Sequence, residues 1–458
     1  MMENQNKAMS GKVIPPGYKL TEVGVIPEDW LLQKLGLHAS FRTGPFGSAL
    51  HKSDYVDGGI PVVNPMQIVD GKVVPTFSMA ISGDAAKKLA EFRLSVGDVV
   101  IGRRGDMGRC AVITEKENGW LCGTGSMIIR VKPSCDAAFL QRILSSASVI
   151  SAIENTSVGT TMINLNQGTL RELQIVLPKN KNEQTAIANA LSDTDELIAT
   201  LEHLIAKKKS IKTATMQQLL TGRTRLSQFS KHSDGTPKGF TSSELGLIPE
   251  DWILSPMSQM GHVLRGVSYN GSRDLFPYDT DDSVRLFRSN NIYNSKIDLA
   301  NLQYVNKNRV AFHQLMNRGD ILICMANGSK NLVGKAAIYN IEESHKYTFG
   351  AFMGVFRTFP EVESLYAFYL LTSDRCRNYI DLALAGSSIN NLKPSDIEQF
   401  TFALPNSEEQ KAIVAILSDM DAELEVLEQK LSKVRGIKQG MMQQLLTGRI
   451  RLPLDHQL

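Results

Sequence analysis

The stretch MQQLLTGRTRL at residues 216–226 returns as MQQLLTGRIRL at residues 442–452, and the single change is Thr224 to Ile450. The repeat units of solenoid and propeller proteins are only about 20–50 residues long. A much longer period, of 226 residues in this chain, indicates that a whole domain arrangement has been duplicated.

Other stretches repeat in the same order along the chain. GVIPEDW at residues 24–30 is matched by GLIPEDW at residues 246–252, and SVGDVVI is matched by NRGDILI. EQTAIANALSDTD, which begins at Glu183, is matched by EQKAIVAILSDMD, which begins at Glu409. The chain is therefore two copies in tandem, and each copy begins with the IPEDW stretch.

Each copy closes with a segment that has the signals of a long helix. Asn180 with Glu183, and Ser407 with Gln410, have the spacing of a capping box just after a proline. A helix of about 40 residues rises 1.5 Å per residue and is roughly 60 Å long. We therefore expect one such rod at the end of each copy.

The long helices carry an apolar seam that alternates steps of three and four residues, the pattern of a left-handed coiled coil. Gly222 and Gly448 stand where a left-handed glycine would end each helix. An amphipathic helix lying on a globular core is the alternative. The residues that we assign to helix pairing and partner binding are Ile187, Leu191, Ile198, Leu201, Ile205 and Leu219 in the first copy, and Ile413, Leu417, Leu424, Leu427, Leu431 and Leu445 in the second.

The segments before the helices have the mixed character of an α+β fold. The strand-like runs DVVIGR, SMIIRV, DILICM and GVFRTF alternate with glycine-rich turns, and one amphipathic helix is expected near residues 136–155 and again near residues 363–382. The expected boundaries are 1–180 for the first mixed domain with its N-terminal segment, 181–222 for the first long helix, 223–245 for a linker, 246–406 for the second mixed domain, 407–447 for the second long helix and 448–458 for a tail.

The composition is that of a globular protein, with 42% hydrophobic and 21% charged residues. No run of about 18 apolar residues is present, and the polar start does not resemble a signal peptide, so we expect a cytoplasmic protein without membrane contact. The five cysteines have no CxxC spacing, which speaks against a metal site. The net charge of +3 permits a nucleic-acid partner without requiring one.

Sequence motifs of catalysis are missing. The stretch GSKNLVGKA at residues 328–336 has one residue too many for a phosphate loop, and NPM at residues 64–66 is an incomplete amino-methyltransferase motif. Neither GxSxG nor HExxH occurs. We therefore assign no catalytic residue, no metal ligand and no cofactor to this chain.

The order of mixed domain and long helix, repeated once, resembles the specificity subunit of type I restriction-modification systems. The IPEDW, GD, EQ-x-AI-x-x-x-LSDxD and MQQLLTGRxRL stretches carry the resemblance, each twice, over nearly the whole chain. It implies an α+β fold with two target recognition domains, joined by two long antiparallel helices that form a coiled coil with pseudo-two-fold symmetry. It also implies a non-catalytic role.

The partners implied by this resemblance are double-stranded DNA, two modification subunits docked on the coiled coil, and restriction subunits that join later. Each target recognition domain would read one half of a bipartite asymmetric site. Two other interpretations stay open. The chain could be a coiled-coil scaffold that binds only proteins, or a self-sufficient DNA methyltransferase or nuclease with unrecognised motifs.

Neither mixed domain is basic throughout, so a DNA-binding face requires local clustering of cations. Residues 31–178 hold 15 Lys and Arg against 12 Asp and Glu, and residues 253–405 hold 15 against 14. Arg, Lys, Asn and Gln side chains can reach base edges and phosphates. The candidates are Arg103, Arg104 and Arg109 with Arg42, Lys52, Asn64 and Gln67 in the first domain, and Asn327, Lys330 and Lys335 with Arg265, Arg273, Arg288, Asn290 and Asn291 in the second.

Overall fold

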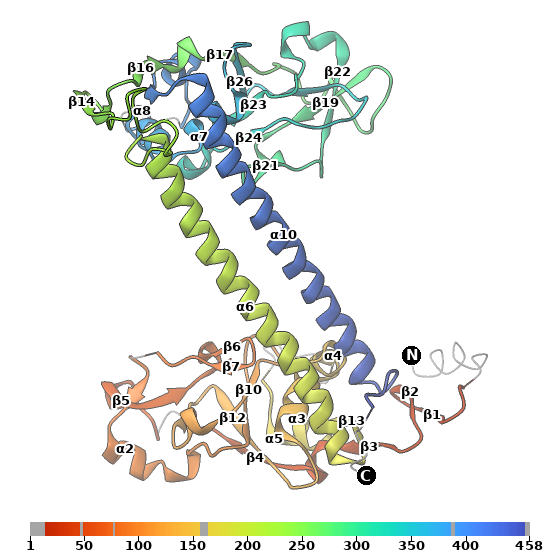
Figure 1. The fold of residues 1–458 in the computed structure, drawn as a ribbon. Helices are drawn as coiled ribbons and strands as arrows, with labels where there is room; N and C mark the ends of the chain where they lie inside the picture. The colour runs from red at the N-terminus through yellow and green to blue at the C-terminus, as the bar shows by residue number, and fades with distance from the viewer. Residues whose placement is uncertain (1–13, 46–48, 77, 156–163, 386–389, 454–458) are drawn as a thin grey trace. The chain divides into compact units, whose positions relative to one another are not determined.

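A computed structural model describes residues 14–45, 49–76, 78–155, 164–385 and 390–453. The chain divides into two compact units, and both contain residues from both sequence copies. Unit 1 comprises Met1–Glu202 with Gln429–Leu458, and unit 2 comprises His203–Glu428. Figure 1 labels many of the helices and strands of both units.

Unit 1 contains a four-stranded sheet in the order β10-β9-β12-β4 and a three-stranded sheet in the order β11-β5-β8. Its other strands pair as β1-β2, β3-β13 and β6-β7. The strands are β1 (Tyr18–Thr21), β2 (Gly24–Pro27), β3 (Trp30–Lys34), β4 (Ala39–Thr43), β5 (Tyr55–Val63), β6 (Ile68–Val69), β7 (Lys72–Val73), β8 (Ala80–Ile81), β9 (Asp98–Gly102), β10 (Cys110–Val112), β11 (Leu121–Cys122), β12 (Ser126–Val131) and β13 (Gln174–Pro178), and the short helices are α2 (Gly83–Lys88), α3 (Ala137–Leu144), α4 (Ala147–Asn155) and α5 (Gln167–Glu172).

Unit 2 repeats this plan with the four-stranded sheet β17-β26-β23-β24, a second sheet β18-β22-β19-β25, and the pairs β14-β15, β16-β27 and β20-β21. Its strands are β14 (Phe240–Ser243), β15 (Gly246–Pro249), β16 (Ile253–Pro256), β17 (Gly261–Arg265), β18 (Leu275–Phe276), β19 (Ser283–Phe287), β20 (Ile292–Tyr293), β21 (Lys296–Ile297), β22 (Gln303–Asn306), β23 (Ile321–Cys324), β24 (Ala336–Ile338), β25 (Tyr347–Phe349), β26 (Met353–Thr358) and β27 (Thr401–Leu404), and its short helices are α7 (Ser364–Leu371), α8 (Asp374–Ala383) and α9 (Pro394–Glu398).

The mixed helix and sheet content that we expected is confirmed, and the four strand-like runs form β9, β12, β23 and β26. The single amphipathic helix expected in each copy is wrong. Two helices stand in its place, α3 and α4 in unit 1 and α7 and α8 in unit 2. The hydroxyl of Ser373 accepts a hydrogen bond from the backbone N–H of Cys376 and so begins α8 as a new helix.

The two long segments form α6 (Lys181–Leu220) and α10 (Ser407–Leu445). Asn406 caps the start of α10, because its Oδ1 accepts a hydrogen bond from the backbone N–H of Glu409. The capping box expected from Ser407 and Gln410 is therefore wrong. Gln410 instead donates to the carbonyl of Pro405, as Gln184 donates to that of Pro178. Asparagine caps a helix at least as well as serine, and it stands one residue earlier.

Within each unit the long helices contact each other through ion pairs. In unit 1 Lys438 of α10 lies 2.5 Å from Asp195 of α6, and Arg435 lies 2.6 Å from Glu202. In unit 2 the pairs are Lys212 with Asp421, Lys208 with Glu423 and Lys209 with Glu428. Of the assigned seam residues, Ile198, Leu427 and Leu431 are half-buried and the others are buried.

Each unit has an apolar core that a long helix helps to close. In unit 1 the core side of the four-stranded sheet packs against α3, α4 and the ends of both long helices, including Leu191, Leu445 and Leu446. In unit 2 the corresponding residues of the long helices that pack in the core are Leu219, Leu220 and Leu417. Among the described residues, no helix is both long and apolar enough to cross a membrane.

Candidate nucleic-acid interface

The strongest cationic cluster of unit 1 lies at one edge of its four-stranded sheet. The strand register pairs Gly102, the last residue of β9, with Ser126, the first residue of β12, while Cys110 begins β10 and Thr43 ends β4. Because these antiparallel strands end or begin at the same edge, the loops that join them gather there. We call this edge, with residues 43–44, 64–67, 103–109, 123–125 and 165–167, the unit 1 edge.

The three arginines of the loop 103–109 have different environments. Arg103 is buried, and its Nε donates to the carbonyl of Leu165 at 3.0 Å. Burial, together with the neighbouring guanidinium of Arg104, lowers the pKa of Arg103. Arg104 is exposed, whereas Arg109 pairs with Asp106 and donates to the carbonyl of Pro65 at 3.4 Å. Arg104 is therefore the arginine with the greatest freedom to contact a ligand.

The segment 64–67 leads into the β6-β7 hairpin and joins this edge. Asn64 Oδ1 accepts a hydrogen bond from the backbone N–H of Gly125 at 3.3 Å. Gln67 is buried, and its amide oxygen accepts from the backbone N–H of Asn64 at 3.0 Å. Asn64 is half-buried and Met66 is 64% exposed, so these two residues, rather than Gln67, face solvent.

Unit 2 builds the equivalent edge from equivalent strands. Met353, which begins β26, pairs with Cys324, which ends β23, and Arg265 ends β17. Asn327 Nδ2 lies 3.4 Å from Ser289 Oγ, and Lys335 donates to the carbonyl of Ile292 at 2.9 Å. These contacts join the loop before β24 to the loop before β20. We call the segments 265–270, 288–293, 326–335 and 350–352 the unit 2 edge.

The side chains of the unit 2 edge also differ in availability. Asn291 is fully buried, and its Nδ2 donates to the carbonyls of Asp298 and Ala300. Lys330 lies 3.8 Å from Asp381. Arg265 and Asn290 are exposed, whereas Arg288, Asn327 and Lys335 are half-buried.

Three candidates lie away from the contacts that define the two edges. Arg42 pairs with Glu91 and lies over the ring of Phe92. Arg273 is exposed in the segment between β17 and β18. Lys52 begins a short 3-10 helix ahead of β5. Neither Arg42 nor Arg273 takes part in the contacts that define the edge of its own unit, and the side chain of Lys52 lies outside the described part of the structure.

Charge is concentrated at these edges although the domains are nearly neutral. The four segments of the unit 2 edge contain Arg265, Arg288, Lys330 and Lys335 and neither Asp nor Glu. The unit 1 edge contains three arginines and one carboxylate, that of Asp106. An edge with this excess of cations attracts polyanions, and its amide and guanidinium groups can hydrogen-bond to bases.

The duplicated stretch itself has a structural role. Arg225 donates to both carboxylate oxygens of Glu409, at 2.6 and 2.7 Å, and to Asp251 at 2.8 Å. Its guanidinium lies over the ring of Trp252, 5.7 Å from the ring centre. We call this group the unit 2 clasp. It joins the end of the first copy to the IPEDW stretch and the helix start of the second copy.

Unit 1 has the same group with the copies exchanged. Arg451, from the second copy, donates to Glu183 at 2.7 Å and to Asp29 at 2.9 Å, and it lies over the ring of Trp30. We call it the unit 1 clasp. The glycine of each repeat has a positive φ, and a Cβ on Gly448 would lie 2.5 Å from Pro27. The glycine and the second arginine of the repeated stretch therefore serve these two joints.

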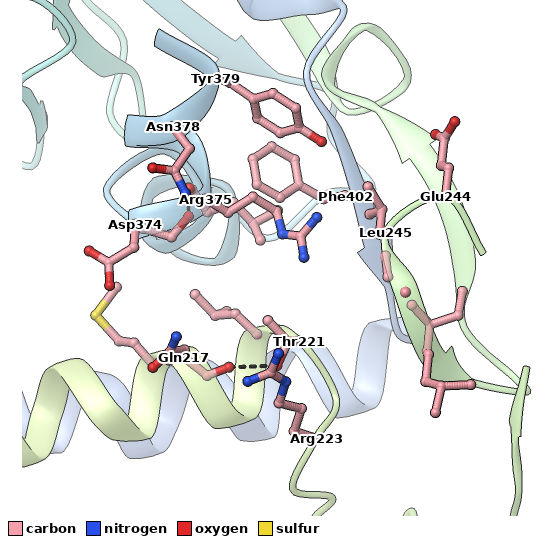
Figure 2. A pocket seen from close by; sticks show the side chains of 18 of the residues that line it. Gln217, Thr221, Arg223, Glu244, Leu245, Asp374, Arg375, Asn378, Tyr379 and Phe402 are labelled. Carbon is pink, nitrogen blue, oxygen red and sulfur yellow. Dashed lines mark hydrogen bonds between the residues drawn. The ribbon is translucent and has the colours of Figure 1, made fainter. Parts of the chain in front are cut away.

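Unit 2 also contains a cavity of about 940 Å³ at the end of α6 (Figure 2). Thr221 and Arg223 line it from the helix end, Leu245 from the turn between β14 and β15, and Arg375 and Tyr379 from α8. Arg375 points into the cavity. The helix end and the β14-β15 hairpin belong to duplicated parts of the chain.

The α8 wall of this cavity is not duplicated. At the positions of Arg375 and Tyr379, the first copy has Ser148 and Ala152. A small-molecule site common to both copies is therefore unsupported. Among the described residues, no group of three or more His, Cys, Asp or Glu side chains could hold a metal ion.

Comparison with known proteins identifies the class of this chain. The family described as the type I restriction modification DNA specificity domain matches residues 42–212 and again residues 249–435. The matches span well over half of the sequence, so the chain belongs to this family. The resemblance noted from the duplicated motifs is thereby confirmed.

Individual relatives agree with this assignment. The EcoKI specificity subunit of Escherichia coli is 33% identical over 205 residues, which are 45% of this chain and 44% of that relative. A putative MjaX specificity subunit of Methanocaldococcus jannaschii is 27% identical over 452 residues, covering 95% and 97% of the two chains. These relatives are named specificity subunits, and the expected assignment to a non-catalytic subunit is confirmed at the level of the family.

Solved structures agree in fold. The specificity subunit of Mycoplasma genitalium aligns with a TM-score of 0.56 and 18% identity, over 94% of this chain and 98% of that one. A chain from a study of the assembly and conformational transition of a type I system aligns with a TM-score of 0.52 and 16% identity, over 93% and 99%. At these identities the likeness concerns the fold alone.

Proposed function

We propose that this chain is the DNA-specificity subunit of a type I restriction-modification complex and reads a bipartite, asymmetric DNA site. The mixed domains, which we place at residues 1–180 and 246–406, would each read one half of the site. The observation that carries the proposal is the pair of edges built from equivalent strands and lined with different side chains. Arginines dominate the loop 103–109, whereas asparagine and lysine dominate the segment 326–335.

Equivalent positions with different chemistry suit two half-sites of different sequence. Arginine pairs in bidentate fashion with guanine, whereas asparagine pairs with adenine. The contacts that we propose come from Arg104, Arg109 and Asn64 in unit 1. In unit 2 they come from Arg265, Arg288, Asn290, Asn327, Lys330 and Lys335. Gln67 and Asn291 instead position their loops, because both side chains are buried and their amides are used internally.

We propose further that α6 and α10 form an antiparallel coiled coil, with residues 223–245 linking the two copies. Two features support this pairing. In each unit two ion pairs run in antiparallel order: Asp195 and Glu202 of α6 pair with Lys438 and Arg435 of α10 in unit 1, and Lys209 and Lys212 pair with Glu428 and Asp421 in unit 2. Each clasp also joins the end of one copy to the helix start of the other copy. The roles of the two copies are exchanged between the two clasps, as a pseudo-two-fold relation requires.

Two modification subunits would dock on this coiled coil, joined in some cells by restriction subunits. An exposed stripe that is identical in both copies supports two docking sites of one kind. Lys207 and Ile211 of α6 recur as Lys433 and Ile437 of α10, and all four are exposed. Ile211 is 42% and Ile437 is 49% exposed. Identical apolar side chains without a role in either core are expected where the same partner binds twice.

The experiment that tests the proposal adds components one at a time. The pure chain is incubated with DNA and a labelled methyl donor, first alone and then with a modification subunit. We expect transfer only after the modification subunit is added, and transfer by the pure chain would contradict the proposal. A gel shift on random-sequence DNA, with and without that subunit, distinguishes a protein-only scaffold, which would leave the DNA unshifted. The cytoplasmic location expected from the sequence belongs to the same proposal.

A further inference from the structure

The unit 2 edge carries a side chain that sequence analysis of cations and amides did not select. Phe352 stands in the short loop between β25 and β26 and is 72% exposed. Its backbone is held firmly. The carbonyl of Phe352 accepts from the backbone N–H groups of Met325 and Ala326, at 2.9 and 3.1 Å, and Gly350 donates to the carbonyl of Phe287 at 3.0 Å.

These contacts place Phe352 amid the cationic segments. The loop 350–352 lies against the end of β17, because a Cβ on Gly266 would come within 2.0 Å of the carbonyl oxygen of Gly350. On its other sides lie the end of β19 and the start of the segment 326–335. The exposed phenylalanine thus stands in a loop bordered by segments that contain four cationic residues and no carboxylate.

Unit 1 has the same loop without the ring. The carbonyl of Gly125 accepts from the backbone N–H of Arg103, and Gly123 donates to the carbonyl of Val63, so Gly125 is the counterpart of Phe352. A Cβ on Gly125 would lie 2.9 Å from Cδ of Pro65, so that edge leaves little room for a side chain. At the position of Pro65 the second copy has Ser289.

We propose that Phe352 is a specificity-determining residue that contacts the methyl group of a thymine in the half-site read by unit 2. The inference rests on the proposed DNA-reading function and deepens it. Phenylalanine has no hydrogen-bonding group, so the feature that it can distinguish in the major groove is the apolar C5 methyl group of thymine. The surrounding cations hold the phosphates, and the fixed loop presents the ring at low conformational cost.

The test uses the full chain in complex with its modification subunit. A split site is first selected from random DNA with the wild-type complex. Each thymine of the half-site that the unit 2 edge reads is then replaced by uracil, which removes only the methyl group, and binding is measured for wild type and Phe352→Ala. We expect one replacement to weaken the wild type roughly tenfold. Phe352→Ala should be weakened to a similar extent on the thymine site and be insensitive to that replacement.

Phe312→Ala is the matched control, because Phe312 is 91% exposed in the same unit and lines a separate cavity with Asn317, Tyr339 and Arg357. This variant should retain wild-type affinity and preference. The inference is overturned if Phe352→Ala keeps both half-site preferences and its uracil sensitivity, or if it weakens binding equally on all sequences. It is also overturned if Phe352→Ala loses only the modification subunit. If the wild-type complex selects no split site at all, the proposed function itself fails.

Discussion

At the scale of single residues, the structure shows that arginines from one short stretch of sequence have different environments. Arg103, Arg104 and Arg109 stand in one GRRGDMGR stretch, yet one is buried, one is exposed and one is paired. The sequence indicated where the cluster lies, because a glycine-rich turn after a buried strand reaches the surface. It could not indicate which guanidinium is free, since that depends on Leu165 and Pro65, which are distant in the chain.

Arg104→Ala should relax the sequence preference in one half-site only. If Arg104 contacts a base, its removal costs roughly 1–3 kcal/mol of binding free energy. The measurement is the affinity of the assembled complex for a set of sites that differ by one base pair. Lys116→Ala, an exposed cation beyond the opposite end of β10, is the control and should have no effect. Equal weakening on every sequence would reduce Arg104 to a phosphate contact.

The clasps give a second prediction at this scale. The side chain of Arg225 is 7% exposed and that of Glu409 is 2% exposed, whereas Arg451 in the other clasp is 39% exposed. Removing one partner of a buried ion pair leaves an unpaired charge and costs roughly 3–5 kcal/mol. Arg225→Ala and Arg451→Ala each leave a buried carboxylate without its cation, because Glu409 is 2% and Glu183 is 1% exposed, so each should lower the free energy of unfolding by several kcal/mol in denaturant unfolding. A loss below about 1 kcal/mol in either variant would contradict the role that we assign to the clasps.

The unit 2 clasp should also respond to acid. Burial alone would raise the pKa of Asp251, but Arg225 and Lys238 outweigh it and lower the pKa from 3.8 to about 2. Because the folded-state pKa is depressed, the stabilisation is fully present above about pH 4 and is lost as pH falls towards 2. The free energy of unfolding should decline over this range more steeply for wild type than for Asp251→Asn. Parallel curves would show that the carboxylate does not contribute.

At the scale of elements, the sequence was most informative where a duplicated motif coincides with the apolar periodicity of a helix. The long helices follow from the spacing of their apolar residues, and Gly222 and Gly448 have positive φ at their ends as expected. The start of α6 was predicted at Asn180, whose Oδ1 accepts from the backbone N–H of Asn182. The start of α10 was placed one residue too late, because Asn406 and Ser407 are both good caps and only the backbone path selects between them. The break between α7 and α8 was missed because the apolar pattern continues across Ser373.

The exposed stripe on the long helices provides the prediction at this scale. Ile211→Glu together with Ile437→Glu places a charge in both proposed docking sites, and capture of the modification subunit should fall at least tenfold. Val426→Glu is the matched control, because Val426 is 64% exposed on α10 and its counterpart in the first copy is Thr200. Capture is measured by co-purification. Equal capture by the double variant and the control would exclude this stripe as a docking surface.

At the scale of the whole molecule, each unit contains residues from both sequence copies. The repeat in the sequence does not by itself predict this. The stretch MQQLLTGRxRL ends one copy in the sequence but closes on the IPEDW stretch of the other copy. The duplication and the family are evident in the sequence. The exchange is not, because the partners Arg451 and Asp29 are separated by almost the whole chain.

The central claim is that two unlike edges read two separate halves of one DNA site. It is tested most directly by selecting the sequences that the wild-type complex, with its modification subunit, binds from random double-stranded DNA. We expect two short blocks of fixed and different sequence, separated by a constant number of unspecified base pairs. A single continuous block, two identical blocks, or no sequence preference at all would contradict the account.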